Sequence, residues 1–205
     1  SSNNILSLQK DNHLIWLATF GGGLNLLDTK TNQFKAFRSI EGNPNAISSD
    51  YLYSVLKDSK GNIWAGTNNG LYKIKPDGTK INYLSNTSKS NTTAPKFVRS
   101  LYEDSRGNIW IGSENSPLVF FDPKKDKFMS LSNLRGTGRI FSSIIFSITE
   151  SPKNIIWVGT DDGNVQLTKD GGKNWTNFRG KIAGMPVGAW IPQIRASRYH
   201  AGEAM

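Results

Sequence analysis

The sequence predicts an all-β fold of the β-propeller class, built of four-stranded antiparallel blades, with about four complete blades and the start of a fifth. Three observations predict it. A tryptophan-containing segment recurs four times, at Trp16, Trp64, Trp110 and Trp157, with spacings of 48, 46 and 47 residues. Within each period the apolar residues alternate or form short runs bounded by Gly, Asn, Asp and Pro, which is a strand pattern. Four short strands repeating at a period in the forties are typical of a propeller blade.

The predicted blades follow one another in a single, partial propeller over residues 1–205. Their boundaries are about 3–39, 45–89, 96–133 and 139–183, with a partial blade over 189–205. At about 47 residues per blade, the chain holds about 4.4 blades. We therefore expect either a fragment of a larger propeller or self-association through open blade edges, because unpaired apolar edges otherwise promote aggregation.

Each blade is expected to contain strands in the same order. The first and fourth blades are placed by their tryptophan strands, within residues 12–19 and 154–160. The strands expected in the second blade are 51–57, 62–66, 71–75 and 80–84. Those expected in the third blade are 97–102, 108–112, 118–122 and 127–131, and 190–195 would begin the fifth. The first two strands of each blade are rich in Ile, Val, Leu and Trp, so we expect them to be buried and the tryptophans to serve packing.

Residues 3 to about 133 resemble the two-component regulator propeller repeat. Its Asp-x-x-Gly-x-Ile-Trp-x-Gly-Thr core followed by Gly-Leu is matched by residues 58–71, and residues 104–128 match it together with the Asp-Pro that precedes an aromatic residue. The resemblance implies a periplasmic sensor propeller of a membrane-bound hybrid histidine kinase.

The last third of the chain departs from that pattern. Residues 168–175, Thr-Lys-Asp-Gly-Gly-Lys-Asn-Trp, resemble the Asp-box (BNR) hairpin of sialidase-like and sortilin-like propellers, with Asn174 where Thr is usual. Residues 158–165 and 190–201 are similar to the same group. This resemblance implies the same fold, and it implies a hairpin that lies away from any catalytic pocket.

Composition excludes several kinds of chemistry. The chain has no cysteine and only two histidines, so thiol catalysis, disulfides and cysteine-ligated or histidine-rich metal sites are not expected, and neither is a cofactor. No apolar run approaches the roughly 20 residues of a membrane span. The net charge of +9 comes from basic residues scattered through turns. No nucleic-acid motif accompanies them, so we expect no nucleic-acid partner.

Catalytic motifs are not found either. The glycines after Phe20 are followed by no phosphate-loop Lys-Ser/Thr, and no Gly-x-Ser-x-Gly nucleophile motif occurs. A glycosidase needs two carboxyl groups that face each other across a sugar, whereas Asp161 and Asp162 are adjacent in sequence. Asp58, Asp104 and Asp170 lie in turns, where aspartate normally accepts hydrogen bonds from nearby backbone N–H groups. The sequence therefore predicts that the chain is not an enzyme.

A ligand is expected at the loops that do not repeat, because such loops on a rigid scaffold usually carry binding specificity. The candidate contacts are Phe20, Asn69, Glu114, Asp161, Asp162 and Trp190. Ordinary solvated loops are the alternative interpretation for each of them.

The sequence and its resemblances together predict a non-catalytic module that senses a ligand, a glycan or another small molecule, or that binds a protein. A periplasmic or extracellular bacterial location follows from the regulator-propeller resemblance. Two alternatives stay open: a fragment of a carbohydrate-active enzyme of the Asp-box kind, and a purely structural interaction scaffold.

Overall fold

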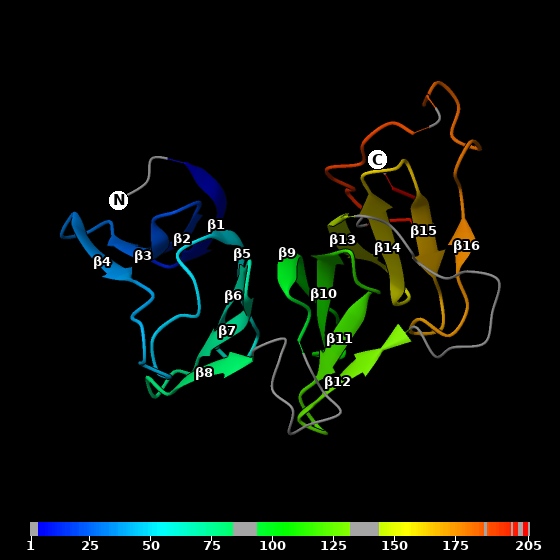
Figure 1. The fold of residues 1–205 in the computed structure, drawn as a ribbon. Coiled ribbons are helices and arrows are strands. Elements are labelled where there is room, and N and C mark those ends of the chain that lie inside the picture. The colour runs from blue at the N-terminus through cyan, green and yellow to red at the C-terminus, as the bar shows by residue number, and fades with distance from the viewer. Residues whose placement is uncertain are drawn as a thin grey trace. The chain divides into compact units, whose positions relative to one another are not determined.

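The computed structural model describes residues 4–83, 94–131, 144–186, 188–197, 199–200 and 203–204. These residues form four four-stranded antiparallel sheets (Figure 1), so the predicted all-β fold is confirmed. The chain divides into two compact units, Ser1–Leu101 and Tyr102–Met205. Within the described ranges, no helix is long and apolar enough to cross a membrane.

The first unit contains two complete sheets, each with its strands in sequence order. The first sheet consists of β1 (Ile5–Asp11), β2 (Leu14–Thr19), β3 (Gly23–Asp28) and β4 (Gln33–Phe37). The second consists of β5 (Leu52–Lys57), β6 (Ile63–Thr67), β7 (Gly70–Ile74) and β8 (Lys80–Tyr83).

The third sheet begins with β9 (Phe97–Glu103), the strand within which the division between the units falls. It continues with β10 (Ile109–Glu114), β11 (Val119–Asp122) and β12 (Lys127–Ser130). The fourth consists of β13 (Ile145–Ser151), β14 (Ile155–Thr160), β15 (Val165–Thr168) and β16 (Thr176–Asn177). The described strand bounds of the second and third repeats lie within two residues of those that the sequence predicts.

The turn before each tryptophan strand of the second and third repeats is held by a buried aspartate. Asp58 Oδ1 accepts hydrogen bonds from the backbone N–H groups of Lys60 and Asn62. Its Oδ2 accepts hydrogen bonds from the Asn62 side-chain amide and from Trp64 Nε1, at 2.7 and 2.8 Å. Gly61 takes a φ of 81° in this turn, which a side chain would disfavour. Asp104 is bound in the same way in the third repeat. The predicted role of these two aspartates in fixing turns is confirmed.

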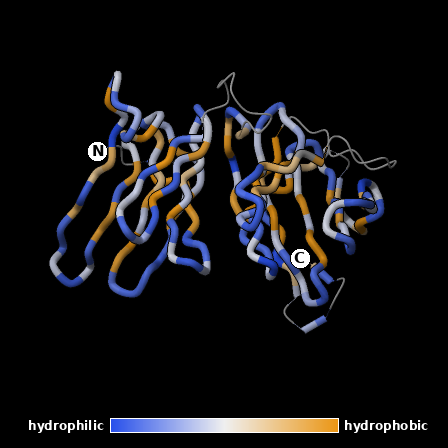
Figure 2. The backbone as a smooth tube through the Cα atoms, turned by 90° about the horizontal axis from the view of Figure 1, so that it is seen from below, coloured by the Kyte–Doolittle hydropathy of each residue, from blue (hydrophilic) through white to orange (hydrophobic). Residues whose placement is uncertain are grey.

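The tryptophan strands form the core of each unit, and Figure 2 shows hydrophobic residues along the strands and hydrophilic residues at the turns. Trp64 and Trp110 are 0% and 1% exposed, as their predicted packing role requires. In the first unit, Leu52 and Ala65 belong to a core cluster with Trp16. The second strand of each sheet is largely buried, and the fourth strand of the first, second and fourth sheets is more exposed. The expected burial of the first strand is wrong for β1, in which every residue is exposed or half-buried.

A small residue on the second strand of a sheet allows the segment that begins the next repeat to pack closely against it. We call these repeat-beginning segments the inner segments, or inner strands where they form strands. A Cβ atom on Gly66 of β6 would lie 2.5 Å from Val98 Cγ1, and one on Gly159 of β14 would lie 2.6 Å from Ile191 Cγ2. Ile194 also donates its N–H to Ser147 Oγ at 2.8 Å, as Val55 does to Ser7 Oγ at 3.3 Å. Residues 191–194 thus cover the fourth sheet as an inner strand would.

The segment 190–195 nevertheless forms no strand, contrary to the sequence expectation. Its neighbour Ala196 makes a single bridge with Ala204. Pro192 explains part of this difference, because proline lacks the N–H group that a strand ladder uses.

Candidate functional site

The six predicted contacts are divided between the two units. Phe20 and Asn69 lie in the first unit, whereas Glu114, Asp161, Asp162 and Trp190 lie in the second. Within each unit, the surroundings of these residues differ sharply.

The two predicted aspartates of the second unit make hydrogen bonds within the fourth repeat, Asp162 inside its own loop and Asp161 to the residue before β13. Asp161 Oδ1 accepts the N–H of Ile144 at 2.9 Å. Asp162 Oδ1 accepts hydrogen bonds from the Thr160 hydroxyl at 2.6 Å and from Asn164 Nδ2 at 2.7 Å. Glu114 is half-buried at the end of β10 and pairs with Ile144 in a β-bridge. These three residues shape the loops, and a role in ligand contact stays a prediction.

Trp190 is different, because its side chain is 72% exposed. Its ring centroid lies 6.0 Å from that of Phe146, so two aromatic rings lie close together at the start of the last covering segment.

Phe20 belongs to the most distinctive surface cluster of the first unit, which we call the aromatic platform: Phe20, Tyr51, Tyr53 and Arg99. Phe20 and Tyr51 are 40% and 44% exposed, and their ring centroids lie 4.9 Å apart in an edge-to-face arrangement. The Tyr53 ring lies 6.0 Å from Phe20. The guanidinium carbon of Arg99 stands 3.9 Å above the centre of the Tyr53 ring. A cation and three rings therefore form one patch.

Backbone contacts hold the platform in place. Phe20 pairs with Tyr51 in a β-bridge, and Gly21 and Gly23 both donate their N–H groups to the carbonyl of Asp50. A Cβ on Gly23 would collide with the Phe37 carbonyl at 2.3 Å, so this loop requires glycine. Arg38 donates to the Gly21 carbonyl at 3.1 Å and to the Asp50 carboxylate at 3.2 Å.

Three of the four platform residues were missed by reasoning from the sequence. Tyr51 and Tyr53 flank Leu52, the first buried residue of β5, and Arg99 follows Val98, the corresponding residue of β9. Aligning the inner strands of the repeats would have identified these positions, because an apolar residue (Ile5, Leu52, Val98 or Ile145) is common to all of them while its neighbours vary.

Asn69 lines a separate cavity of about 650 Å³ in the first unit, together with the link between the first two sheets. Its N–H is bound by Thr67 Oγ1 at 2.9 Å and its side chain is exposed. None of the platform residues lines this cavity.

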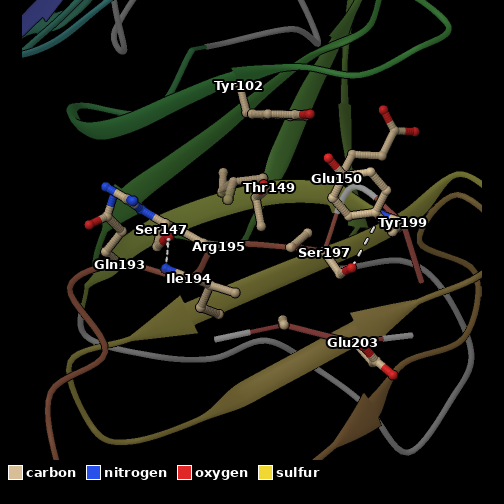
Figure 3. A pocket seen from close by; sticks show the side chains of 13 residues that line it. Tyr102, Ser147, Thr149, Glu150, Gln193, Ile194, Arg195, Ser197, Tyr199 and Glu203 are labelled. Atoms are coloured by element: carbon tan, nitrogen blue, oxygen red, sulfur yellow. Dashed lines mark hydrogen bonds between the residues drawn. The ribbon is translucent and has the colours of Figure 1, made fainter. Parts of the chain in front are cut away.

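A cavity of about 1190 Å³ lies in the second unit between the inner strand β13 and the segment that begins at Gln193 (Figure 3). No predicted contact residue lines it. The Glu150 carboxylate on its wall accepts the N–H and hydroxyl of Ser105 at 2.7 and 2.9 Å. Burial raises the pKa of Tyr102 there, and the negative charge of Glu150 raises it further. These polar groups support the packing of the turns around the cavity.

The aromatic platform presents groups that can contact a ligand. Across the described ranges, no three His, Cys, Asp or Glu side chains gather into a site that could hold a metal ion. Ring stacking and an arginine charge are the groups that the platform offers to a ligand.

Comparison with known families identifies the repeat. Residues 46–69 and 94–115 match the model of the two component regulator propeller. The chain carries two-component regulator propeller repeats. The matched residues include Tyr51, Tyr53 and Arg99 of the platform. No curated protein matches the chain in sequence.

Solved structures share the fold. An extracellular domain described as part of the hybrid two component system BT4673 from B. thetaiotaomicron has a TM-score of 0.76 at 20% identity, over 97% of this chain and 25% of that one. Virginiamycin B lyase from Staphylococcus aureus has a TM-score of 0.64 at 14% identity, over 85% of this chain and 55% of that one. PorZ, a surface component of the type-IX secretion system of Porphyromonas gingivalis, has a TM-score of 0.61 at 14% identity, over 94% of this chain and 29% of that one.

These matches establish the four sheets as propeller blades. The chain spans about a quarter of the length of the extracellular domain that it matches. The resemblance to an Asp-box at residues 168–175 stays a prediction.

Proposed function

We propose that this chain is a non-catalytic ligand-binding module of a bacterial sensor propeller that works outside the cytoplasm. The observation that carries the proposal is the aromatic platform, which places exposed rings beside a cation on a backbone frame that is already fixed. Such a surface binds a planar or ring-shaped ligand with little loss of conformational entropy. The matched repeats and the fold of the extracellular sensor domain support the same reading.

A glycan is the ligand class that we propose for the platform. The faces of sugar rings carry C–H groups that pack on aromatic rings, and Arg99 can donate to hydroxyl or carboxylate oxygens. Trp190, beside Phe146, is a second proposed contact in the other unit. Asn69, Glu114, Asp161 and Asp162 are proposed to shape the loops around such contacts.

The hypothesis of an Asp-box carbohydrate-active enzyme has less support. Asp170 accepts the Asn174 N–H and side chain at 2.9 and 2.7 Å, and Thr168 Oγ1 donates to it at 2.8 Å. These hydrogen bonds stabilise the hairpin, and the Asp170 carboxylate accepts all three of them.

The test is a glycan array, followed by calorimetric titration of a glycan that binds. We expect Phe20→Ala and Tyr51→Ala each to weaken binding about fivefold, since losing a stacked ring costs on the order of 1 kcal/mol. Phe34→Ala is the matched control, because Phe34 is 65% exposed on β4 and lies outside the platform.

Equal losses in the platform variants and the control would contradict the assignment of the site. Hydrolysis of any bound glycan would contradict the non-catalytic function.

A further inference from the structure

The indole N–H of the repeated tryptophan has an acceptor at an equivalent place in three repeats. Trp64 donates to Asp58 at 2.8 Å, and Trp110 donates to Asp104 at 2.9 Å. In the fourth repeat, Trp157 donates to Ser151 Oγ at 3.2 Å. Each acceptor lies four residues after the serine of the inner strand and six residues before its tryptophan.

The first repeat breaks this pattern. Trp16 is only 7% exposed, yet its Nε1 has no hydrogen-bond partner among the described residues. Asp11 lies four residues after Ser7, as the acceptors of the other repeats do, but it precedes Trp16 by five residues instead of six. The Asp11 carboxylate instead contacts Lys57 Nζ at 2.5 Å. A buried donor without an acceptor is unfavourable, because it has lost its bond to water and gained none.

A cavity of about 460 Å³ lies beside this tryptophan, within the first unit. Its wall includes Trp16, Phe37, Asp11 and three lysines, Lys35, Lys75 and Lys80. The ammonium groups of Lys35 and Lys80 lie 5.2 and 5.8 Å from the centre of the same Phe37 ring. The ring face attracts both cations, and an anion bound between them would offset their mutual repulsion.

The charge balance of the wall is positive. Asp11 is the one carboxylate among the lining residues, and it already pairs with Lys57. Asp77, in the turn between Lys75 and Lys80, accepts the N–H of Thr79 at 2.8 Å. An orphaned indole N–H and a surplus of ammonium groups are two independent features, and both favour an acceptor at this cavity.

We propose that this cavity binds an oxyanion carried by a small ligand, with Lys35 and Lys80 as its charge partners and the indole N–H of Trp16 as a further donor. Carboxylate, sulfate and phosphate share this chemistry. Phe37 provides an apolar face beside the anion, suited to a ring that bears the acidic group. Because Trp16 Nε1 exposes less than 1 Å², its contact with the oxyanion requires the lining side chains to move. The site is separate from the aromatic platform and does not depend on its function.

Calorimetric titration of the chain with sodium sulfate, sodium phosphate and sodium glucuronate at low ionic strength tests this proposal. We expect saturable binding at one site. The double variant Lys35→Gln/Lys80→Gln is expected to weaken it about tenfold or more, because both charge-assisted contacts are lost. The control is Lys30→Gln/Lys60→Gln, which removes the same charge from two exposed lysines that do not line the cavity.

Trp16→Phe tests the indole donor separately, since phenylalanine keeps an aromatic ring but has no N–H. We expect a loss of about threefold or more, with folding checked by circular dichroism. Should this variant fail to fold, the two lysine pairs still decide the question. Tighter binding of glucuronate than of sulfate would identify a ring-bearing acid, and equal binding would identify the oxyanion alone; both support the site.

Two results would overturn the proposal: the absence of saturable binding for all three anions, or equal losses in the two lysine pairs. Phe20→Ala is expected to leave anion affinity unchanged, so failure of this site and failure of the platform are distinguishable.

Discussion

Single aspartates organise the turns of this protein. Asp58 has a side chain that accepts hydrogen bonds from two backbone N–H groups, an amide and an indole, all within a stretch of seven residues. The turn, the start of β6 and the orientation of Trp64 therefore depend on one carboxylate. The sequence predicted this role because an aspartate before a glycine-containing turn normally binds nearby N–H groups.

Asp58→Ala is expected to lower the free energy of unfolding by about 3 kcal/mol, because it leaves buried donors without an acceptor. Urea unfolding followed by fluorescence measures the effect. The matched control is Asp77→Ala, in an exposed turn of the same repeat, where we expect a much smaller loss because the carboxylate is solvated. Similar losses at both positions would show that burial of the Trp64 donor is unimportant.

Asp104 gives the fold a dependence on pH. Burial opposes its ionisation, but hydrogen bonds from Asn108 and Trp110, assisted by the charge of Arg106, hold the pKa of Asp104 below its ordinary value. The folded chain therefore binds fewer protons here than the unfolded chain in acid. Its stabilising contribution is complete above the unfolded pKa, about 3.9, and is lost as the pH falls through the lower folded pKa.

We expect Asp104→Asn to be less stable than the wild type by about 1–3 kcal/mol at pH 7. This difference should shrink as the pH is lowered from about 5 to 3. Urea unfolding at pH 7, 5, 4 and 3 measures it, and a difference that stays constant across this range would contradict the ionised role of Asp104.

At the scale of the element, the inner strand has a repeated design. β1, β5 and β13 each have an irregularity in register before their serine, at Ser7, Ser54 and Ser147. The serines of β1 and β13 accept an N–H from the next inner segment. A bulge re-aims the neighbouring side chains. It is the reason that Tyr53, within the bulge of β5, reaches the platform.

Gly66→Ala tests the close approach of strands in the first unit. The added Cβ would lie 2.4 Å from Ser54 Oγ, 2.5 Å from Val98 Cγ1 and 2.7 Å from the Val98 carbonyl oxygen. Such overpacking is expected to cost about 1–3 kcal/mol in a urea unfolding experiment. Gly42→Ala is the control, because nothing lies within 4 Å of that Cβ, although its φ of 74° adds some backbone strain. A Gly66 variant as stable as the Gly42 variant would contradict the tight packing.

Strands were predictable in this chain to within two residues because alternation and turn residues are local signals. The same local signals failed at residues 190–195, which follow the apolar spacing of an inner strand but form no strand, although Ile191 donates its N–H to the Thr160 carbonyl of β14 at 3.0 Å. A strand requires a partner for its N–H and C=O groups, and only the tertiary structure shows whether one is in place.

At the scale of the whole molecule, β1 has an uncovered apolar face. Ile5 and Leu8 are 51% and 64% exposed, whereas Leu52 and Val55, at the same places in β5, are 0% and 7% exposed. The apolar side chains that are exposed on β1 therefore occupy positions whose equivalents in the second repeat are buried. Exposed apolar patches of this kind usually mark interaction surfaces.

We expect the chain to self-associate through this face. Sedimentation velocity over a range of concentrations should show reversible association, weakened about tenfold or more by Ile5→Ser/Leu8→Ser. Phe34→Ser, on the exposed strand β4, is the control. A monomer at every concentration tested would contradict this prediction.

The sequence by itself determined the repeat, the four-stranded blades, the turn aspartates and one platform residue, Phe20. Each depends on residue types at fixed local spacing. Tertiary structure decided that Tyr51, Tyr53 and Arg99 gather beside Phe20. It also decided that Trp16, alone among the four repeated tryptophans, has a buried Nε1 with no partner in the part of the chain that the structure describes. Those contacts join residues from different strands, and one missing residue in a turn was enough to move an acceptor away from its donor. The reason is physical: hydrogen bonds and ring contacts depend on distances of a few ångströms that only the folded chain establishes.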